Sequence, residues 1–211
     1  ALYSTPAGKN TIVIVLADHG DGMGSHRMVT KQVSFYEEMT NVPFIIAGPG
    51  IHPRQKPVED LLTQPTIDLL PTLCELAGIP VPSSKPGISL APFLKGEKQK
   101  RQHPYAASEW HSEYEVTVSP GRMIRSPRYK YTHYLEGNGE ELYDMLKDKG
   151  ERRNLAHDPK YSKILAEHRA LLDDYIRRTQ DDYRSLKVEA DKRWRSHAPG
   201  YPNHEGPCAR D

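Results

Sequence analysis

The sequence has little of several features that would point to particular classes of protein. Its two cysteines, Cys74 and Cys208, form no C-x-x-C pair and are too few for a disulfide framework. No apolar run approaches the roughly 18 residues that a membrane span requires. Basic and acidic residues nearly balance, with a formal net charge of +1. We therefore expect no membrane span and no nucleic acid partner, because a phosphate backbone is bound by a strongly basic surface.

Apolar residues are also scarce for a free-standing globular protein. They make up 36% of the 211 residues, charged residues make up 27%, and 18 prolines are present. At roughly 150 residues per domain, this length suits one domain with an appendage. The polar composition predicts long surface segments or an incomplete domain.

After a short linker over residues 1–9, the first part of the chain alternates strands and helices. Thr11–Ala17 is apolar and rich in β-branched residues without alternation, which predicts a strand buried on both faces, as in a parallel sheet covered by helices. A mixed segment over 31–39 is expected to be helical, and Val42–Ile46 to form a second buried strand. This order is that of an α/β layer fold.

The next predicted helix lies within residues 66–80. Asp68 is its candidate cap, Pro71 falls in its first turn, and Gly78 followed by Pro80 ends it.

The character of the sequence changes after residue 102. Short segments between 105 and 134, spaced by proline and glycine, predict an antiparallel meander. A polar turn region follows and leads into a helix from Tyr161, with apolar residues at steps of three and four. We assign residues 10–102 to an α/β core, 103–180 to a sheet and helix subdomain, and 181–211 to an extended tail.

The first apolar strand ends in the pattern D-H-G-x-x-x-G-x-H-x-x-x-x-K, which contains Asp18, His19, His26 and Lys31. Ligands bind beyond the carboxyl ends of strands in open parallel sheets, and Gly20 permits the sharp turn that lets adjacent side chains reach one ion. Asp and His together suit a divalent cation. Two alternatives stay open: Asp18 could cap a helix, and an isolated lysine is commonly a solvated surface residue.

This pattern, followed by FYEEMTNVPFIIAGPGI, TIDLLPTLCELAGI, GRMIRSPRYKYTHYL and EELYDMLKDKGERRNLA, resembles the C-terminal half of the type I sulfatases, the formylglycine-dependent members of the alkaline phosphatase superfamily. The resemblance covers about residues 10 to 180. It implies the C-terminal part of an alkaline-phosphatase-like α/β sandwich, followed by a small antiparallel sheet packed with a C-terminal helix. It also implies a periplasmic or secreted protein.

The resemblance assigns roles to the residues of the pattern. Asp18 and His19 would be two ligands of the active-site divalent cation, which is usually calcium in the family. Lys31 would neutralise a sulfate oxygen near the leaving group. His26 falls on a recurrent histidine of the motif, for which substrate contact and loop support both stay open.

The departures from the family pattern matter as much. The nucleophile motif C-x-P-S-R, or C-x-A-S-R, is absent, and so is the N-terminal pair of metal-binding aspartates. We therefore expect this chain to be the C-terminal portion of a sulfatase, inactive alone, whose partner is the missing N-terminal portion of the same enzyme. The metal site would be only half present.

A substrate subsite is predicted in the stretch SEWHSEY. Trp110 can stack on a sugar face, Glu109 and His111 can bind hydroxyl groups, and Arg122, like Arg125, can pair with an anionic sugar. Ordinary strand-edge and solvated roles stay open for all of them. Sugar sulfates, including glycosaminoglycan fragments, are the preferred substrates. The alternatives are a phosphonate monoester hydrolase or phosphodiesterase of the same superfamily, and a non-catalytic fragment.

Overall fold

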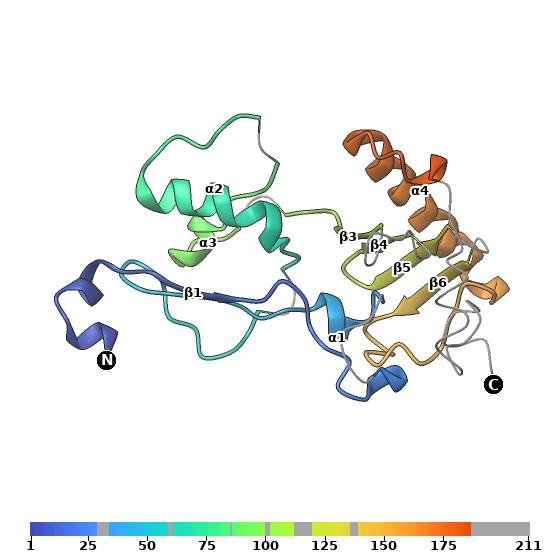
Figure 1. Ribbon diagram of the computed structural model, residues 1–211, viewed down its shortest axis with the longest axis horizontal. Coiled ribbons are helices and arrows are strands. Elements are labelled where there is room, and N and C mark those ends of the chain that lie inside the picture. The colour runs from blue at the N-terminus through green and yellow to red at the C-terminus, as the bar shows by residue number, and fades with distance from the viewer. Residues whose placement is uncertain are drawn as a thin grey trace, which may run out of the picture. The chain divides into compact units, whose positions relative to one another are not determined.

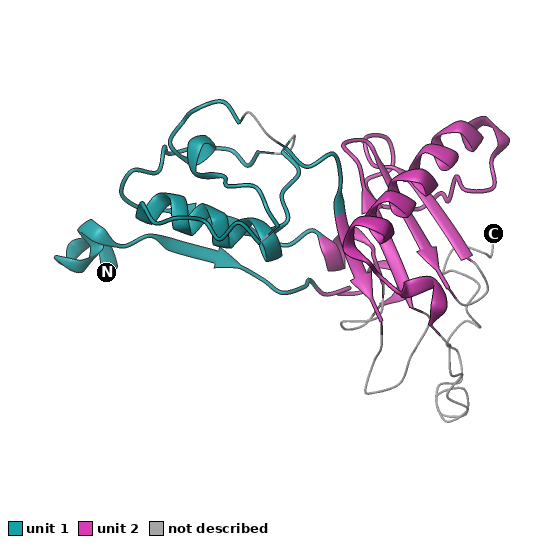
Figure 2. Cartoon of the chain, turned by 90° about the horizontal axis from the view of Figure 1, so that it is seen from above, with its two compact units in different colours: residues 1–20, 41–106 teal, residues 21–40, 107–211 magenta. Residues whose placement is uncertain are grey.

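The computed structural model describes residues 1–28, 34–58, 61–84, 86–99, 102–111, 120–135 and 139–186. They belong to two compact units, one of residues 1–20 and 41–106 and one of residues 21–40 and 107–211 (Figure 2). The division predicted from sequence places residues 21–40 with the first part of the chain, whereas in the structure they pack with the second unit.

The first unit contains a two-stranded sheet. Strands β1 (Val13–Leu16) and β2 (Phe44–Ala47) pair antiparallel, with Val13 opposite Ala47. The parallel sheet expected from sequence is not formed by these two strands, which pair antiparallel, and Val15 and Ile45 are 49% and 58% exposed. An apolar run indicates an extended, poorly solvated backbone, but it carries no information on the direction of the neighbouring strand.

Helix α2 (Pro65–Ala77) begins earlier than its sequence suggests. Gln64 is the N-cap and Pro65 occupies the first turn, so Pro71 lies inside the helix and Asp68 is not the cap. The Asp68 carboxylate instead accepts hydrogen bonds from the backbone of Gln64 and Ile88, both at 2.8 Å. The helix ends as predicted at Gly78, which has a left-handed φ of 70°.

The remaining helices of this unit are short. They are the 3-10 helices η1 (Leu2–Ser4) and η2 (Ala7–Asn10) and helix α3 (Ala91–Leu94).

The second unit is built on a four-stranded sheet in the order β3-β4-β5-β6 (Figure 1). The strands are β3 (Ala106–Trp110), β4 (Gly121–Arg125), β5 (Tyr129–Tyr134) and β6 (Gly139–Asp144). Strands β4, β5 and β6 pair antiparallel, which confirms the predicted meander. The segment predicted as a polar turn region starts with a strand, because β6 pairs along its whole length with β5.

One face of this sheet is covered by helix α4 (Ser162–Thr179), as Figure 1 shows. Leu165, His168 and Leu172 of the predicted stripe are buried. The 3-10 helix η5 (Pro159–Tyr161) precedes α4, and η6 (Tyr183–Ser185) follows it, with Tyr183 fully buried. The first residues after Asp181 thus pack against the unit, and those from 187 on lie outside the described residues.

The opposite face of the sheet receives the chain that follows the Asp-His-Gly motif. The 3-10 helix η3 (Ser25–Arg27) and helix α1 (Glu37–Thr40) belong here. Of the helix predicted over 31–39, the part from Glu37 on is helical, residues 34–36 are not, and residues 31–33 lie outside the described residues. A buried cluster joins this segment to the sheet and the turn after it: Met28, Tyr36, Met39, Tyr143 and Met145.

No helix within the described ranges is both long and apolar enough to cross a membrane.

Glu141 on β6 provides a test of this packing. It is 5% exposed, and burial, followed by the charge of Glu151, raises its pKa to about 7, while Lys130 acts in the opposite direction. A folded pKa above the unfolded value means that folding is favoured by protonation, so this contribution is present below the unfolded pKa and lost as pH rises through about 7.

We expect Glu141→Gln to raise the free energy of unfolding at pH 8 by roughly 3 kcal/mol, at about 1.4 kcal/mol per pKa unit, and to change it little at about pH 4.5. Urea titrations at both pH values measure the effect, with the exposed Glu167→Gln as control. An equal gain at both pH values would contradict the assignment.

Candidate functional site

Asp18 and His19 lie just beyond the end of β1, as the motif predicts. The backbone N–H of His19 donates to Asp18 Oδ1 at 3.0 Å, and His19 Nδ1 lies 2.7 Å from the carbonyl oxygen of Gly20. The His19 Nε2 atom is 3.7 Å from Asp18 Oδ2. The local turn therefore brings an imidazole nitrogen and a carboxylate oxygen together.

The partner of Nδ1 decides which nitrogen of His19 can act as a ligand. A carbonyl oxygen only accepts, so Nδ1 carries the hydrogen and Nε2 keeps its lone pair. This is the arrangement in which the second ring nitrogen of a metal-binding histidine is oriented by a backbone carbonyl. The Asp18 side chain is 89% and the His19 side chain 41% exposed, so both are accessible. The pair fits two ligands of a divalent cation.

A complete metal site is not formed by the described part of the chain. Within those residues, no group of three or more His, Cys, Asp or Glu side chains is placed to hold an ion.

His26, the second histidine of the motif, is held on an aromatic ring of the second unit. Its ring stacks on that of Tyr36 with centroids 3.7 Å apart and an interplanar angle of 2°. Its Nε2 lies 3.9 Å from Glu38 Oε2, and its side chain is 13% exposed. Lys31, predicted to contact the sulfate group, lies outside the described residues.

The loop that carries His26 has an uncommon backbone. His26, Met23 and Arg27 have φ values of 49°, 46° and 61° in the left-handed region, which costs a non-glycine residue roughly 1–2 kcal/mol. Hydrogen bonds across the loop hold it, including one of 2.7 Å from Gly24 N to Met28 O. Such strain persists only where the surroundings impose it.

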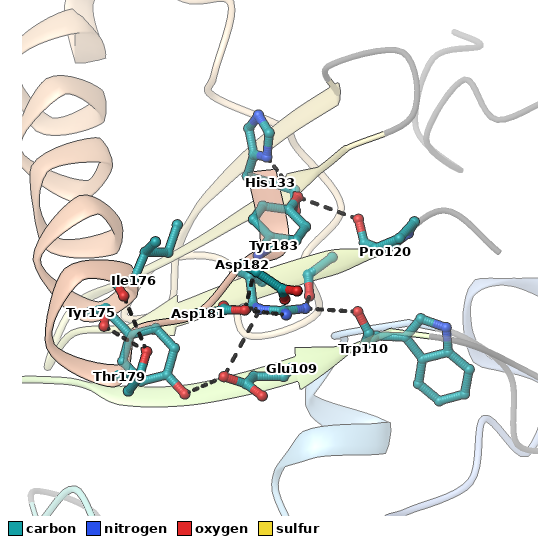
Figure 3. A network of polar contacts seen from close by, with 12 residues as sticks. Glu109, Trp110, Pro120, His133, Tyr175, Ile176, Thr179, Asp181, Asp182 and Tyr183 are labelled. Carbon is teal, nitrogen blue, oxygen red and sulfur yellow. Dashed lines mark hydrogen bonds and ion pairs between the residues drawn. The ribbon is translucent and has the colours of Figure 1, made fainter. Parts of the chain in front are cut away.

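Of the predicted substrate residues, Glu109 and Trp110 lie at the end of β3, within the polar network of Figure 3. The Tyr175 hydroxyl donates to Glu109 Oε1 at 2.6 Å. The carbonyl of Trp110 accepts from Arg122 Nη1 at 2.8 Å. His111 follows the strand and is exposed. The structure therefore brings Glu109, Trp110 and His111 to one strand end, and their role in binding substrate stays a prediction.

Arg122 lies beneath this strand end and is 3% exposed. Its Nε and Nη2 donate to the two oxygens of Asp181 at 2.6 and 2.9 Å. Its guanidinium carbon stands 4.5 Å from the centroid of the Tyr183 ring. Desolvation lowers the Arg122 pKa, but the hydrogen bond and charge of Asp181 outweigh it, and the net shift is upward. The same bond lowers the Asp181 pKa. These contacts favour a structural role for Arg122, and its predicted role in binding substrate stays a prediction.

Sequence reasoning missed the partners of these residues. The sequence predicts Asp181 and Tyr183 in a tail, and Tyr36 in a mixed, helical segment to which no role is given. The only available signal was an aromatic residue, Tyr183, within an otherwise charged stretch. The roles of Asp181, Tyr183 and Tyr36 depend on contacts with residues distant in sequence, and such contacts produce no local sequence pattern.

Comparison with known proteins identifies the family. The family model described as "N-sulphoglucosamine sulphohydrolase, C-terminal" matches residues 24–178. The chain therefore belongs to this family of sulfatases. The predicted resemblance and the predicted fold class are both confirmed.

Individual relatives agree with this result. The chain is 77% identical over 211 residues to the Delta 4,5-hexuronate-2-O-sulfatase of Bacteroides thetaiotaomicron, covering 100% of this chain and 44% of that protein. The solved structure of a 2-O GAG sulfatase matches with a TM-score of 0.89 and 77% identity, over 99% of this chain and 45% of the other. A phosphonate monoester hydrolase from Silicibacter pomeroyi matches with a TM-score of 0.73 and 27% identity, over 88% and 38%. The chain thus spans less than half the length of these relatives.

Replacing Arg122 separates its two possible roles. Because Asp181 would be left buried without its partner, we expect Arg122→Met to lower the free energy of unfolding by about 3–5 kcal/mol. The double variant Arg122→Met/Asp181→Leu should recover much of this loss. Chemical denaturation measures both, with the exposed Arg152→Met as control. A stable Arg122→Met variant that loses activity would favour substrate binding instead.

Proposed function

We propose that this chain is the C-terminal part of a sulfatase that removes the 2-O-sulfate from an unsaturated hexuronate, a sugar released from glycosaminoglycan. The observation that carries the proposal is that His19 Nε2 and Asp18 Oδ2 lie 3.7 Å apart at the end of β1, in a member of a sulfatase family. The choice of substrate rests on the 77% identity to a relative of that specificity.

Asp18 and His19 would provide two ligands for a divalent cation, for which calcium is the family's usual choice. When bound, such a cation would withdraw charge from the sulfate oxygens and orient them. Within this chain, the hydrogen bond from Nδ1 to the Gly20 carbonyl holds the imidazole in the tautomer that leaves Nε2 available. The carboxylate of Asp18 supplies the negative charge that a hard cation requires.

The other assigned residues would act on the substrate. Lys31 would place its ammonium group near the oxygen that receives charge as the alcohol departs. This role rests on the position of Lys31 in the motif. His26 would contact the substrate from the side of the loop, while Trp110 and His111, with Glu109, would bind the sugar.

The rest of the enzyme would supply the nucleophile and the remaining metal ligands, and this portion is the expected partner of the chain. A chain with half of a metal site should bind a divalent cation weakly and hydrolyse no ester alone. A periplasmic or secreted location is part of the proposal, by family resemblance.

Hydrolysis of phosphonate monoesters is the second candidate, favoured by the 27% identity to the solved hydrolase. The two functions share a fold and a motif, so substrate preference separates them.

The experiment uses the longer protein in which this chain lies. We expect calcium-dependent release of sulfate from a 2-O-sulfated unsaturated disaccharide, with a specificity constant well above that for a 6-O-sulfated disaccharide or a phosphonate monoester. Chelation and Asp18→Asn should both abolish the activity, and the exposed Glu97→Gln should not. A preference for the phosphonate would establish the second candidate, and a preference for the 6-O-sulfate would refute the assigned substrate.

Lys31→Ala tests the catalytic assignment. Removing one preorganised charge-stabilising group typically costs on the order of a hundredfold in rate, so we expect kcat to fall by about that factor while the protein stays folded. Steady-state kinetics and circular dichroism measure the two properties, with Lys163→Ala on the exposed side of α4 as control. Near-normal turnover would exclude the role.

A further inference from the structure

Three charged side chains, one from the sheet and two from segments that pack against it, have no part in the proposed chemistry. The side chains of Lys130 and Glu151 are each 1% exposed, and that of Glu37 is 26% exposed. Lys130 Nζ lies 2.7 Å from Glu37 Oε1 and 2.9 Å from Glu151 Oε1. We name these three residues the ion cluster.

The ion cluster also binds the backbone on both sides of Tyr36. Lys130 Nζ donates to the carbonyl oxygen of Phe35 at 2.8 Å. The backbone N–H of Glu37 donates to Glu151 Oε2 at 2.6 Å. Phe35, before Tyr36, is therefore hydrogen-bonded to a buried side chain of β5. Glu37, after Tyr36, is hydrogen-bonded to a buried side chain in the turn after β6.

Tyr36 contacts both the interior of the unit and the His26 loop. It is 3% exposed and packs in the buried cluster with Met28, Met39, Tyr143 and Met145, with its ring centroid 6.3 Å from that of Tyr143. Toward the loop it presents a ring face, on which His26 lies parallel at 3.7 Å. The position of the His26 ring thus follows from the position of Tyr36.

Packing alone would not require charges here. A buried ion pair is often no more stabilising than apolar residues of the same volume, and its best attested use is to select one geometry. The arrangement is costly in other ways, since Glu151 adopts a left-handed φ of 50°. Arg125, with Nε 3.9 Å from Glu37 Oε1, adds a second positive charge that balances the two carboxylates.

We propose that the ion cluster positions His26: Lys130, Glu151 and Glu37 hold Tyr36 as a fixed platform, and the face of Tyr36 sets the place of the imidazole in the active site. These are positioning residues, because none of them needs to touch substrate. The inference rests on the proposed function, in which His26 contacts the substrate.

The test follows the exposure of His26 in the full-length protein by its rate of carbethoxylation with diethyl pyrocarbonate, resolved by peptide mass spectrometry. We expect Tyr36→Leu to raise the His26 rate about tenfold, the equivalent of roughly 1.4 kcal/mol of lost stacking. Glu37→Met should also raise the carbethoxylation rate of His26, while Tyr36→Phe, which keeps the aromatic ring, should leave that rate unchanged. The exposed His157 provides an internal control, and Lys147→Met a matched surface variant.

Activity gives a second, independent readout. Because a displacement of about 1 Å can cost up to a hundredfold in rate, Tyr36→Leu should lower kcat/KM by roughly tenfold to a hundredfold. The loss of kcat/KM should divide between kcat and KM in the same proportion as in His26→Ala. The double variant Tyr36→Leu/His26→Ala should lose little more activity than His26→Ala alone.

The results distinguish this inference from the proposed function. Unchanged His26 labelling in folded Tyr36→Leu and Glu37→Met variants would overturn the inference, even in an active sulfatase. Faster labelling in a protein that hydrolyses no sulfate ester would support the positioning of His26 and refute the proposed function. Lys130→Met is the stronger variant, but the test does not depend on it if that protein fails to fold.

Discussion

The second unit depends on two buried cations, one on each face of its four-stranded sheet. Arg122 on β4 points to the side of α4, where it binds Asp181, and Lys130 on β5 points to the opposite side, where it binds Glu37 and Glu151. Each cation joins the sheet to a segment distant in sequence. Because an unpaired buried charge is strongly unfavourable, each segment has one geometry in which the charge is paired. This is how a chain with modest apolar content obtains defined contacts on both faces.

Arg122 and Lys130 also lie close to the residues for which we propose functional roles. On one side, Arg122 binds the carbonyl of Trp110, at the strand end from which His111 emerges. On the other, Lys130 binds the chain beside Tyr36, on which His26 stacks. A catalytic site benefits when its side chains are held by a surrounding layer that does not itself react. The sheet therefore serves as a support for two different groups of candidate residues.

Asp18 and His19 belong to the other unit and are organised more locally. Their geometry follows from adjacent residues at the end of a strand, with the Gly20 carbonyl orienting the imidazole. For this reason the meeting of Asp18 and His19 at a strand end was predictable from sequence, as was the helix over Ser162–Thr179, whose stripe repeats at the helical period. Their role as metal ligands stays a prediction. The direction of β1 was not predictable in the same way, because it depends on the strand with which β1 pairs. The start of α2 did have a local signal, since a proline such as Pro65 is favoured in the first turn of a helix.

By itself, the sequence determined the family, the antiparallel pair β4 and β5, the helix after Tyr161, and the motif of Asp18, His19 and His26, because each depends on residues close together in the sequence. Only the tertiary structure decided what supports them. Glu151 lies 114 positions from Glu37, and Asp181 lies 59 from Arg122. Periodicity and spacing report on the next few residues, whereas the energy of a buried charge is set by whichever groups the fold brings within hydrogen-bond distance.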